Sequence, residues 1–547
     1  MIHPLHLELE TAHQYKSDVW KGMRGGAYIL TGGVGSGKTT LLRRFARIVE
    51  KDFVDRYAAW VHIDFLPIGN VDPVVIDSEL QRFAYRRIRE YLQGHFHTEL
   101  ANTGDKIREL FKDEIDQAKL TLLYGIEDGS PDWDKAVNNL VDGFLRDDAR
   151  FAFAAFRALQ RRGRRIAIVL DNTDQLGESF QEKVFLFSQK LSEEHQALCV
   201  VTLREEKFFA AYRRGIFDAF GDRRFHIGAP DLRQLLRKRL EYGRTKFKAL
   251  AKADPGALSQ QDLQRIDGLL RSLIASTTDK NQNIVRMLAS LSNGDMRHAL
   301  DMFREFLSSG NTNIDKIIAI LERQDTYTVA FHEFAKSAIL GSRKYYQASV
   351  SHIVNLFRQS DALGSSHMTA CRILARLTAS EGVASAHGEG FVTASTLLRE
   401  YRQSFGFADD LIQWTGELIR RNLIESEPPR VTDINYADAL RITAAGAYYW
   451  RYFVRSFAYI DLVFVDTPLA DFSLVKRLEM AADKTDMPSR LERVGTFLGY
   501  VARKENEELQ ISAERARPFQ EALMPLIKRQ IESEMGVIRR KTGLHPE

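Results

Sequence analysis

A glycine-rich segment near the start of the chain has the residue types and the spacing of a phosphate-binding loop. Residues 32–39, GGVGSGKT, fit the pattern G-x-x-x-x-G-K-[ST] without a mismatch. The apolar run 27–30 precedes the pattern, and apolar residues at helical spacing follow it, at positions 41, 42, 45, 48 and 49. A buried strand, a glycine loop and a helix in this order predict a nucleotide site rather than a flexible linker.

Different residues of this loop are suited to bind the phosphates of ATP and the Mg²⁺ ion. Its glycines let the backbone curl so that several N–H groups point at one anion, and the following helix adds its positive end. Lys38 can reach the outer phosphates, and the Thr39 hydroxyl can ligate Mg²⁺. The residues predicted to bind the nucleotide here are Gly32, Gly33, Val34, Gly35, Ser36, Gly37, Lys38, Thr39 and Thr40.

Two further strands end in polar residues that suit the same chemistry. The strand 165–170, RIAIVL, leads into Asp171, and an aspartate at that strand tip can hold the Mg²⁺ shell opposite Thr39. The strand 198–202 ends at Thr202, which can position a water molecule or simply close the strand. Arg204, just beyond it, is a second candidate for that position.

The remaining pattern predicts an α/β P-loop core followed by helical modules. Strands at 58–65 and 225–227 complete a parallel sheet with ligand groups at the strand ends. Beyond residue 231 helical periodicity prevails, until three helices and a hairpin at 423–425 and 439–442 give the order of a winged helix. We expect a core at 1–230, a lid at 231–310, a helical connector at 311–365, a winged-helix module at 366–455 and a helical region at 456–547.

Composition predicts a cytoplasmic protein. The chain has 547 residues, 44% of them hydrophobic, and a net charge of only +4, which neither demands nor excludes nucleic acid. Cys199 and Cys371 stand in apolar surroundings, which favours buried free thiols over a disulfide or a metal site. We expect no signal peptide and no membrane span, because no apolar run approaches the ~18 residues that a span needs.

These motifs together resemble those of the AAA+ ATPases, closest to the initiator and clamp-loader branch, and those of the related STAND-type NTPases. The matching segments are GGVGSGKT, IVLDNTDQL, GDRRFHIGAPD and GDMRHAL. The resemblance implies that Arg223 or Arg224 acts as an arginine finger on a neighbouring subunit, so that the protein would be a homo-oligomer. It also implies that Arg297 contacts the nucleotide as the sensor 2 arginine.

One residue departs from the family pattern and bears on hydrolysis. Asn172 stands where the resemblance implies a glutamate that activates the attacking water, and an amide cannot take a proton at neutral pH. Asp174, Glu205 or Glu206 could take that role, or hydrolysis is slow. The histidines at 62, 226 and 298 have no metal-ligand spacing to one another and are interpreted as structural.

Three functions remain open on the sequence alone. The first is a switch ATPase, STAND-like and compatible with signalling or antiviral defence, that assembles and engages a protein through its C-terminal modules. The second is an initiator- or loader-like ATPase that binds nucleic acid, and the third is a scaffold that keeps nucleotide for stability.

The charge of the predicted winged helix favours the switch. Residues 407–430 carry five acids against three bases, so the helix is a poor reader of the DNA groove, while Trp414 is a candidate anchor for a protein. DNA contacts would then come from the arginines of 161–165 or from 539–541.

Overall fold

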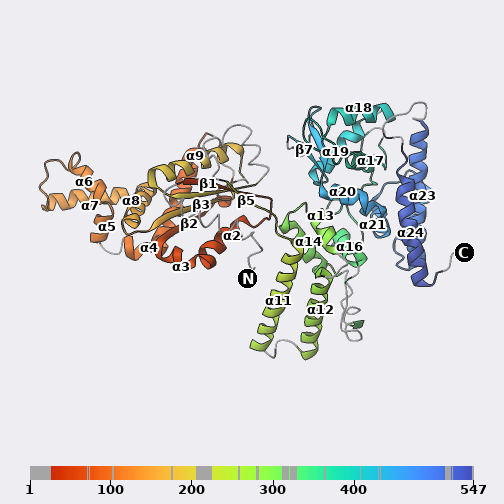
Figure 1. Cartoon of the computed structure of the whole chain (residues 1–547), viewed down its shortest axis with the longest axis horizontal. Helices are drawn as coiled ribbons and strands as arrows, with labels where there is room; N and C mark the ends of the chain where they lie inside the picture. Colours follow the sequence, from red (N-terminus) through yellow and green to blue (C-terminus); the bar gives the residue numbers. More distant parts are fainter. Residues whose placement is uncertain are drawn as a thin grey trace. The chain divides into compact units, whose positions relative to one another are not determined.

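The chain folds into two compact units, Pro4–Ala229 and Pro230–Glu547 (Figure 1). The computed structural model describes residues 26–69, 72, 74–100, 104–173, 176–204, 224–254, 256, 259–278, 283–310, 319–320, 329, 331–362, 365–406, 408–428, 430, 433–511, 519 and 521–544. Each unit is described by itself. Within these residues no helix is long and apolar enough to cross a membrane.

The first unit is built on the predicted parallel sheet of five strands. The strands are β1 (Gly26–Gly32), β2 (Ala58–Asp64), β3 (Arg165–Asp171), β4 (Leu198–Arg204) and β5 (Arg224–Ile227), in the spatial order β2-β3-β4-β1-β5. All four pairings are parallel. The carboxyl ends of all five strands therefore meet at one edge, which is where the phosphate loop leaves β1.

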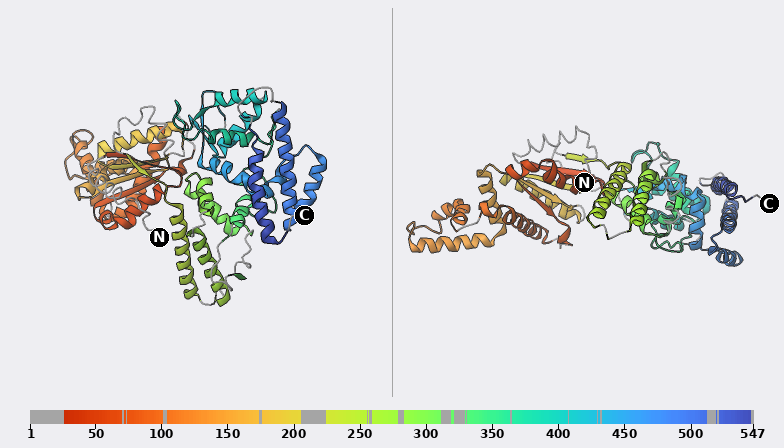
Figure 2. Two further views of the ribbon diagram at one scale, coloured as in Figure 1. Left: turned by 45° about the vertical axis from the view of Figure 1, so that its right-hand side comes forward. Right: turned by 90° about the horizontal axis from the view of Figure 1, so that it is seen from below.

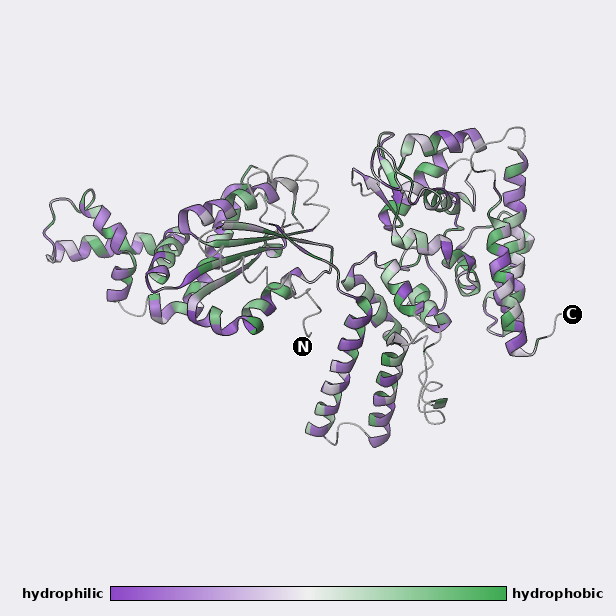
Figure 3. Cartoon of the chain, in the orientation of Figure 1, coloured by the Kyte–Doolittle hydropathy of each residue, from purple (hydrophilic) through white to green (hydrophobic). Residues whose placement is uncertain are grey.

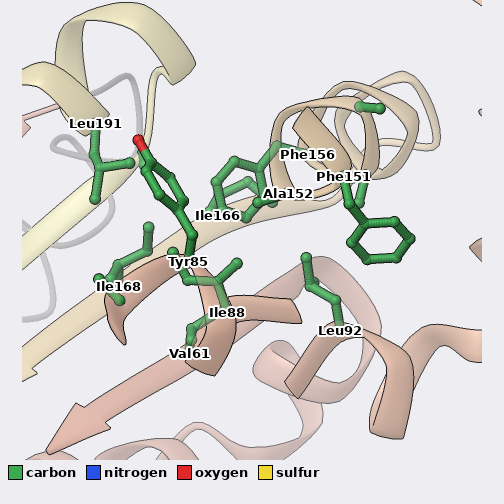
Figure 4. Packing of buried hydrophobic residues seen from close by; sticks show 14 of the residues in the cluster. Val61, Tyr85, Ile88, Leu92, Phe151, Ala152, Phe156, Ile166, Ile168 and Leu191 are labelled. Carbon is green, nitrogen blue, oxygen red and sulfur yellow. The ribbon is translucent and has the colours of Figure 1, made fainter. Parts of the chain in front are cut away.

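Alternate side chains of each strand point to opposite faces of the sheet, and each face has its own hydrophobic core. Ala59, Val61 and Ile63 of β2 belong to a large core with α4 (Ile76–Leu100), α8 (Asp148–Arg161) and α9 (Glu178–His195). Figure 4 shows Tyr85, Ile88 and Phe156 of this core packing over β2 and β3. Ala58 and Trp60 instead face a smaller core with α2 (Lys38–Arg44) and α3 (Lys51–Tyr57). Even-numbered residues of β2 thus face the phosphate-loop helix.

The helix after the loop departs from the predicted pattern. A π-helical turn, Phe45–Val49, follows α2 and turns Ile48 and Val49 outward, at 55% and 57% exposure. Only Leu42, Phe45 and Ala46 of this stretch are buried. The apolar periodicity predicted the helix correctly, but not which of its residues form the core.

The long connection between β2 and β3 forms a helical arm. The helices α5 (Gly104–Leu110), α6 (Lys112–Lys119) and α7 (Pro131–Arg146) extend from the α/β core beyond α4 and α8 (Figures 1 and 2). Turns fill most of 120–130. Leu120, Leu122 and Tyr124 are all more than 70% exposed at its tip.

The second unit begins with helices. It contains α11 (Leu232–Ala253), α12 (Gln260–Thr278), α13 (Asn283–Leu291), α14 (Met296–Ser308) and α16 (Phe331–Leu340). Most of the first part of the predicted helical connector, residues 311–330, lies outside the described residues. The described part of 341–365 contains turns and no helix, although Ile353, Leu356 and Phe357 are buried. The prediction of a helical connector is therefore wrong for this stretch.

The predicted helices and hairpin follow. The elements are α17 (Thr369–Thr378), α18 (Ala394–Phe405), α19 (Asp409–Arg420), β7 (Ile424–Glu427) and β8 (Ala439–Ile442). A two-residue strand, β6 (Val392–Thr393), which the sequence analysis missed, pairs with β8. The C-terminal region is helical as predicted, in α20 (Ala444–Arg451), α21 (Phe457–Val463), α22 (Phe472–Ala482), α23 (Met487–Ile511) and α24 (Met524–Thr542).

The burial of Trp414 and of the two cysteines tests the predictions made for these residues. Trp414 on α19 is only 5% exposed, so the interpretation of this residue as an anchor for a partner is wrong. Its ring fills the interior of its own module. Cys199 and Cys371 are buried free thiols, as predicted, and burial raises the pKa of Cys371 to about 12.

Candidate nucleotide site

The phosphate loop has the backbone geometry that its glycines predict. A Cβ atom on Gly32 would lie 2.7 Å from the carbonyl oxygen of Ile227, so only glycine fits where β1 meets β5. Gly37 adopts the left-handed conformation, with φ of 93°, and begins α2. No side chain caps the first turn of this helix, which leaves its N–H groups directed at the loop.

Two side chains of the loop are placed to meet an anion. The ammonium group of Lys38 folds back and donates hydrogen bonds to the carbonyl oxygens of Gly32 at 2.8 Å and Gly33 at 3.1 Å. It therefore sits over the loop, where phosphate oxygens would replace the carbonyls. The Ser36 hydroxyl is buried and has no hydrogen-bond partner among the described residues. A buried donor of this kind suits a phosphate oxygen.

Asp171 lies at the centre of a strand-tip cluster that also contains His62, Asp64, Asn172 and Thr202. Alternation along β2, β3 and β4 puts His62, Asp171 and Thr202 on the face of the phosphate-loop helix. Thr202 donates a hydrogen bond to Asp171 Oδ1 at 2.6 Å, and His62 Nε2 lies 3.0 Å from Asp171 Oδ2. Because an ionised carboxylate only accepts, Nε2 of His62 carries the proton in this contact.

The electrostatics of Asp171 keep it ionised. Burial alone would raise its pKa, but hydrogen bonds from His62, Thr202 and Thr39 outweigh burial and lower the pKa from 3.8 to about 2. The effect of Thr39 on this pKa indicates that its side chain, at the start of α2, lies close to the tip of β3. The two residues predicted to ligate Mg²⁺ therefore lie close together, and one of them, Asp171, carries a negative charge.

Asn172 is held in a fixed orientation beside this carboxylate. Its φ of 60° places it in the left-handed region, which asparagine tolerates better than most residues. Its side-chain amide donates to Asp64 Oδ1 at 2.7 Å, and Leu66 N donates to the same oxygen at 3.0 Å. With Nδ2 engaged, the carbonyl oxygen of Asn172 is the atom left to accept a hydrogen bond.

The remaining predicted site residues lie elsewhere or outside the described residues. Asp174, Arg223, Glu205 and Glu206 are outside them. Arg224 begins the edge strand β5 and pairs in register with Ile29, three positions before Gly32. It is exposed there, about 10 Å along the strand from the loop edge, so it does not join the strand-tip cluster of its own chain.

Arg297, Arg204 and Val34 complete the account of the predicted residues. Arg297 is exposed on the first turn of α14 in the second unit, where Asp295 caps the helix. Its contact with nucleotide stays a prediction. Arg204 pairs in register with Gly32 at the end of β4. Val34 is half-buried in the loop and Thr40 is exposed on α2.

Sequence reasoning missed His62 and Asp64. His62 was interpreted as structural because it lacks metal-ligand spacing, and Asp64 received no role. The signal was present in the alternation of β2, AAWVHIDF, which puts Trp60, His62 and Asp64 on one face. The register of β2 against β3 pairs Asp64 with Asp171, but no pattern in the sequence specifies that register.

The fold and the site define a P-loop NTPase core. No protein-family model matches the chain, and no curated protein matches it. Among solved structures it is similar to Cdc6p from Pyrobaculum aerophilum, at 15% identity, with a TM-score of 0.29, covering 81% of this chain and 91% of that one. It is also similar to the ORC2 protein of Aeropyrum pernix in its ADP form, at 12% identity, with a TM-score of 0.33 and the same coverage.

Proposed function

We propose that this chain is an ATP-binding switch ATPase, of AAA+ or STAND-like type, that hydrolyses ATP slowly and self-associates. Its C-terminal modules would engage a partner protein. The observation that carries the proposal is the position of Lys38 over the loop, together with a Thr39 side chain close enough to Asp171 to lower its pKa. This arrangement brings together the two motifs that P-loop enzymes use for Mg²⁺, while Lys38 contacts the carbonyl oxygens of Gly32 and Gly33 in the same loop.

The residues of the site would share the work of phosphoryl transfer. Lys38 would exchange its two carbonyl acceptors for outer phosphate oxygens of ATP. Thr39 and Asp171 would hold Mg²⁺, which neutralises charge on the phosphates when bound. His62 and Thr202 would keep Asp171 ionised and correctly oriented, because each donates to one of its oxygens.

Slow turnover follows from Asn172. The fixed carbonyl oxygen of this residue can orient the attacking water, but it cannot accept the proton. Asp64 holds Asn172 in place through its Oδ1 and acts as a positioning residue in this proposal. The acid that takes the proton remains open between Asp174 and Glu205 or Glu206, all outside the described residues.

Phosphate release from ATP tests the proposal. The full chain should release phosphate in the presence of Mg²⁺ and stop when EDTA removes the metal. Asp171→Ala should abolish release, because the carboxylate that holds the metal is lost. Wild-type protein that binds ATP but releases no phosphate would leave only the scaffold function, in which nucleotide stabilises the fold.

The second candidate is an initiator- or loader-like ATPase acting directly on nucleic acid. It needs a basic surface, and α19 does not supply one. Asp410 is buried and accepts hydrogen bonds from Ser360, Ser366 and Thr369. Arg421 is tied to Glu417 and to backbone carbonyls at 348 and 351. Groove reading by this helix is therefore unsupported, and the partner of this module is proposed to be a protein.

A further inference from the structure

Helix α11 carries more positive charge than the whole chain. Its 22 residues, LRQLLRKRLEYGRTKFKALAKA, contain eight basic residues and one acidic residue, for a net charge of +7. The net charge of the full chain is +4. The rest of the chain carries a net negative charge that offsets the charge of α11, so the net charge of the chain did not indicate this basic surface.

The second half of α11 is exposed. The buried residues of the helix, Leu232, Leu235, Leu236 and Leu240, all lie in its first half. Beyond Leu240 the helix runs alongside α12, and Figures 1 and 3 show this hairpin extending away from α13 and α14 as a mostly hydrophilic arm. Leu250 is 69% exposed there. The arm therefore adds little apolar burial to the unit, and its role must come from its surface.

Acidic partners neutralise only part of the charge. Glu241 pairs with Arg237 at 2.8 Å, and Asp267 of α12 binds Arg244 through both oxygens, at 2.5 and 2.9 Å. Asp267 also lies 3.4 Å from Lys248. The contacts of Asp267 join α11 to α12, whereas the Glu241–Arg237 pair lies within α11.

Three exposed basic residues of α11 are left over. Arg239, Lys246 and Lys252 have no acidic partner within the described ranges. Arg239 and Lys246 are seven residues apart, which is two helical turns, so they project from the same side. They are free to meet anions from outside the chain.

The dimensions and the chemistry of the arm suit the phosphate backbone of a duplex. From Arg239 to Lys252 the helix rises about 20 Å, more than half of the ~34 Å of one turn of DNA. Duplex DNA carries one negative charge per ~1.7 Å of its axis, so it can meet basic groups along this whole length. A membrane-surface helix would also need an apolar face, and the large apolar side chains exposed on α11, Tyr242 and Leu250, are too few to form one.

We infer that α11, from Arg239 to its C-terminal end, binds the phosphate backbone of duplex DNA, without reading its sequence. The inference does not depend on ATP binding or hydrolysis. Of the other basic clusters considered from the sequence, the arginines of 161–165 are less suited to this role. Arg161 pairs with Asp113, and Arg164 binds both oxygens of Glu99. These two arginines are therefore already neutralised by acidic residues of the first unit.

A charge-matched pair of variants tests the inference in the full chain. The test variant carries Arg239→Gln, Lys246→Gln and Lys252→Gln. The control carries Lys112→Gln, Lys135→Gln and Arg146→Gln, which remove the same charge from exposed positions on α6 and α7 of the first unit. Both leave apolar contacts intact, and thermal unfolding by circular dichroism should be unchanged in both.

Fluorescence anisotropy with a labelled mixed-sequence duplex gives the readout, over a series of salt concentrations. Each phosphate contact contributes about 0.9 to the slope of log affinity against log salt, so the test variant should lose up to ~2.7 from the slope. Its affinity should fall at least about tenfold at ~100 mM salt, while the control matches wild type. Equal losses in both variants, no binding by wild type, or equally tight binding to anionic phospholipid vesicles would overturn the inference. A protein that binds DNA in this way but not ATP would refute only the proposed ATPase.

Discussion

The hydroxyl of Thr202 offers a direct test of how the strand-tip cluster is held. Thr202→Val keeps the shape of the side chain but removes the donor to Asp171 Oδ1 at 2.6 Å and the acceptor for Asn172 N at 3.3 Å. Thr202 is 1% exposed, so water cannot replace these bonds. A hydrogen bond to a buried charge contributes about 1.5–3 kcal/mol, and we expect a loss of about 2 kcal/mol in the free energy of opening of the sheet.

The pH dependence of that loss identifies Asp171 as its origin. The pKa of Asp171 is lowered to about 2 in the folded chain, against about 3.9 for an unfolded aspartate, so its ionised form stabilises the fold above pH ~4. This contribution disappears as the pH falls toward 2. The pKa of Asp171 should rise in Thr202→Val, so the difference from wild type should be full at pH 7 and shrink below pH ~4.

Hydrogen exchange of the β3 and β4 amides, followed by mass spectrometry, measures this opening without requiring the two units to unfold together. Thr31→Val is the matched control, because Thr31 is equally buried in the neighbouring strand and donates a neutral bond to Phe225 O at 3.1 Å. It should cost about 1 kcal/mol, with no change between pH 4 and pH 2. If Thr202→Val behaved like this control, with no pH dependence, the assignment of Asp171 as the ionised centre of the cluster would be refuted.

Two further predictions concern turnover and assembly. Asp64→Ala should free the Asn172 amide and lower the rate of phosphate release by about tenfold, while ATP affinity is retained. The double variant Asp64→Asn with Asn172→Asp exchanges the two side chains. It should restore or raise turnover, because it moves a carboxylate next to Asp171. An exchanged variant as slow as Asp64→Ala would argue against the positioning role. ATP should increase the mass measured by light scattering, and Arg224→Ala should weaken this response, since the proposed site is completed by a neighbouring subunit; a chain that stays monomeric at high concentration with and without ATP would rule this out.

The sequence predicted the sheet well because each strand carries its own signal. Apolar runs bounded by polar ends defined all five strands within a few residues, and glycine spacing located the phosphate loop. What the sequence could not supply was register. Asp64 and Asn172 are 108 residues apart, and only the pairing of β2 with β3 brings them together.

Burial and local charge were the other features beyond reach of pattern reasoning. Trp414 and Ile48 have similar positions on apolar helix faces, yet Trp414 is buried and Ile48 is exposed. The burial of such a residue depends on which elements pack against it in the folded chain. The charge of α11 was missed for a different reason. The basic residues can be counted in the sequence, but the small net charge of the whole chain did not indicate that they cluster on one helix.

ATP binding by the phosphate loop is the claim on which the rest depends, and calorimetric titration of the full chain with ATP and Mg²⁺ measures it directly. Wild type should bind one ATP, and Lys38→Ala should lose at least about a hundredfold in affinity, or roughly 3 kcal/mol, because the cation over the loop is removed. Lys51→Ala, which removes an exposed lysine paired with Asp55 in the same unit, should bind as wild type does. Equal affinity of wild type and Lys38→Ala would contradict the account.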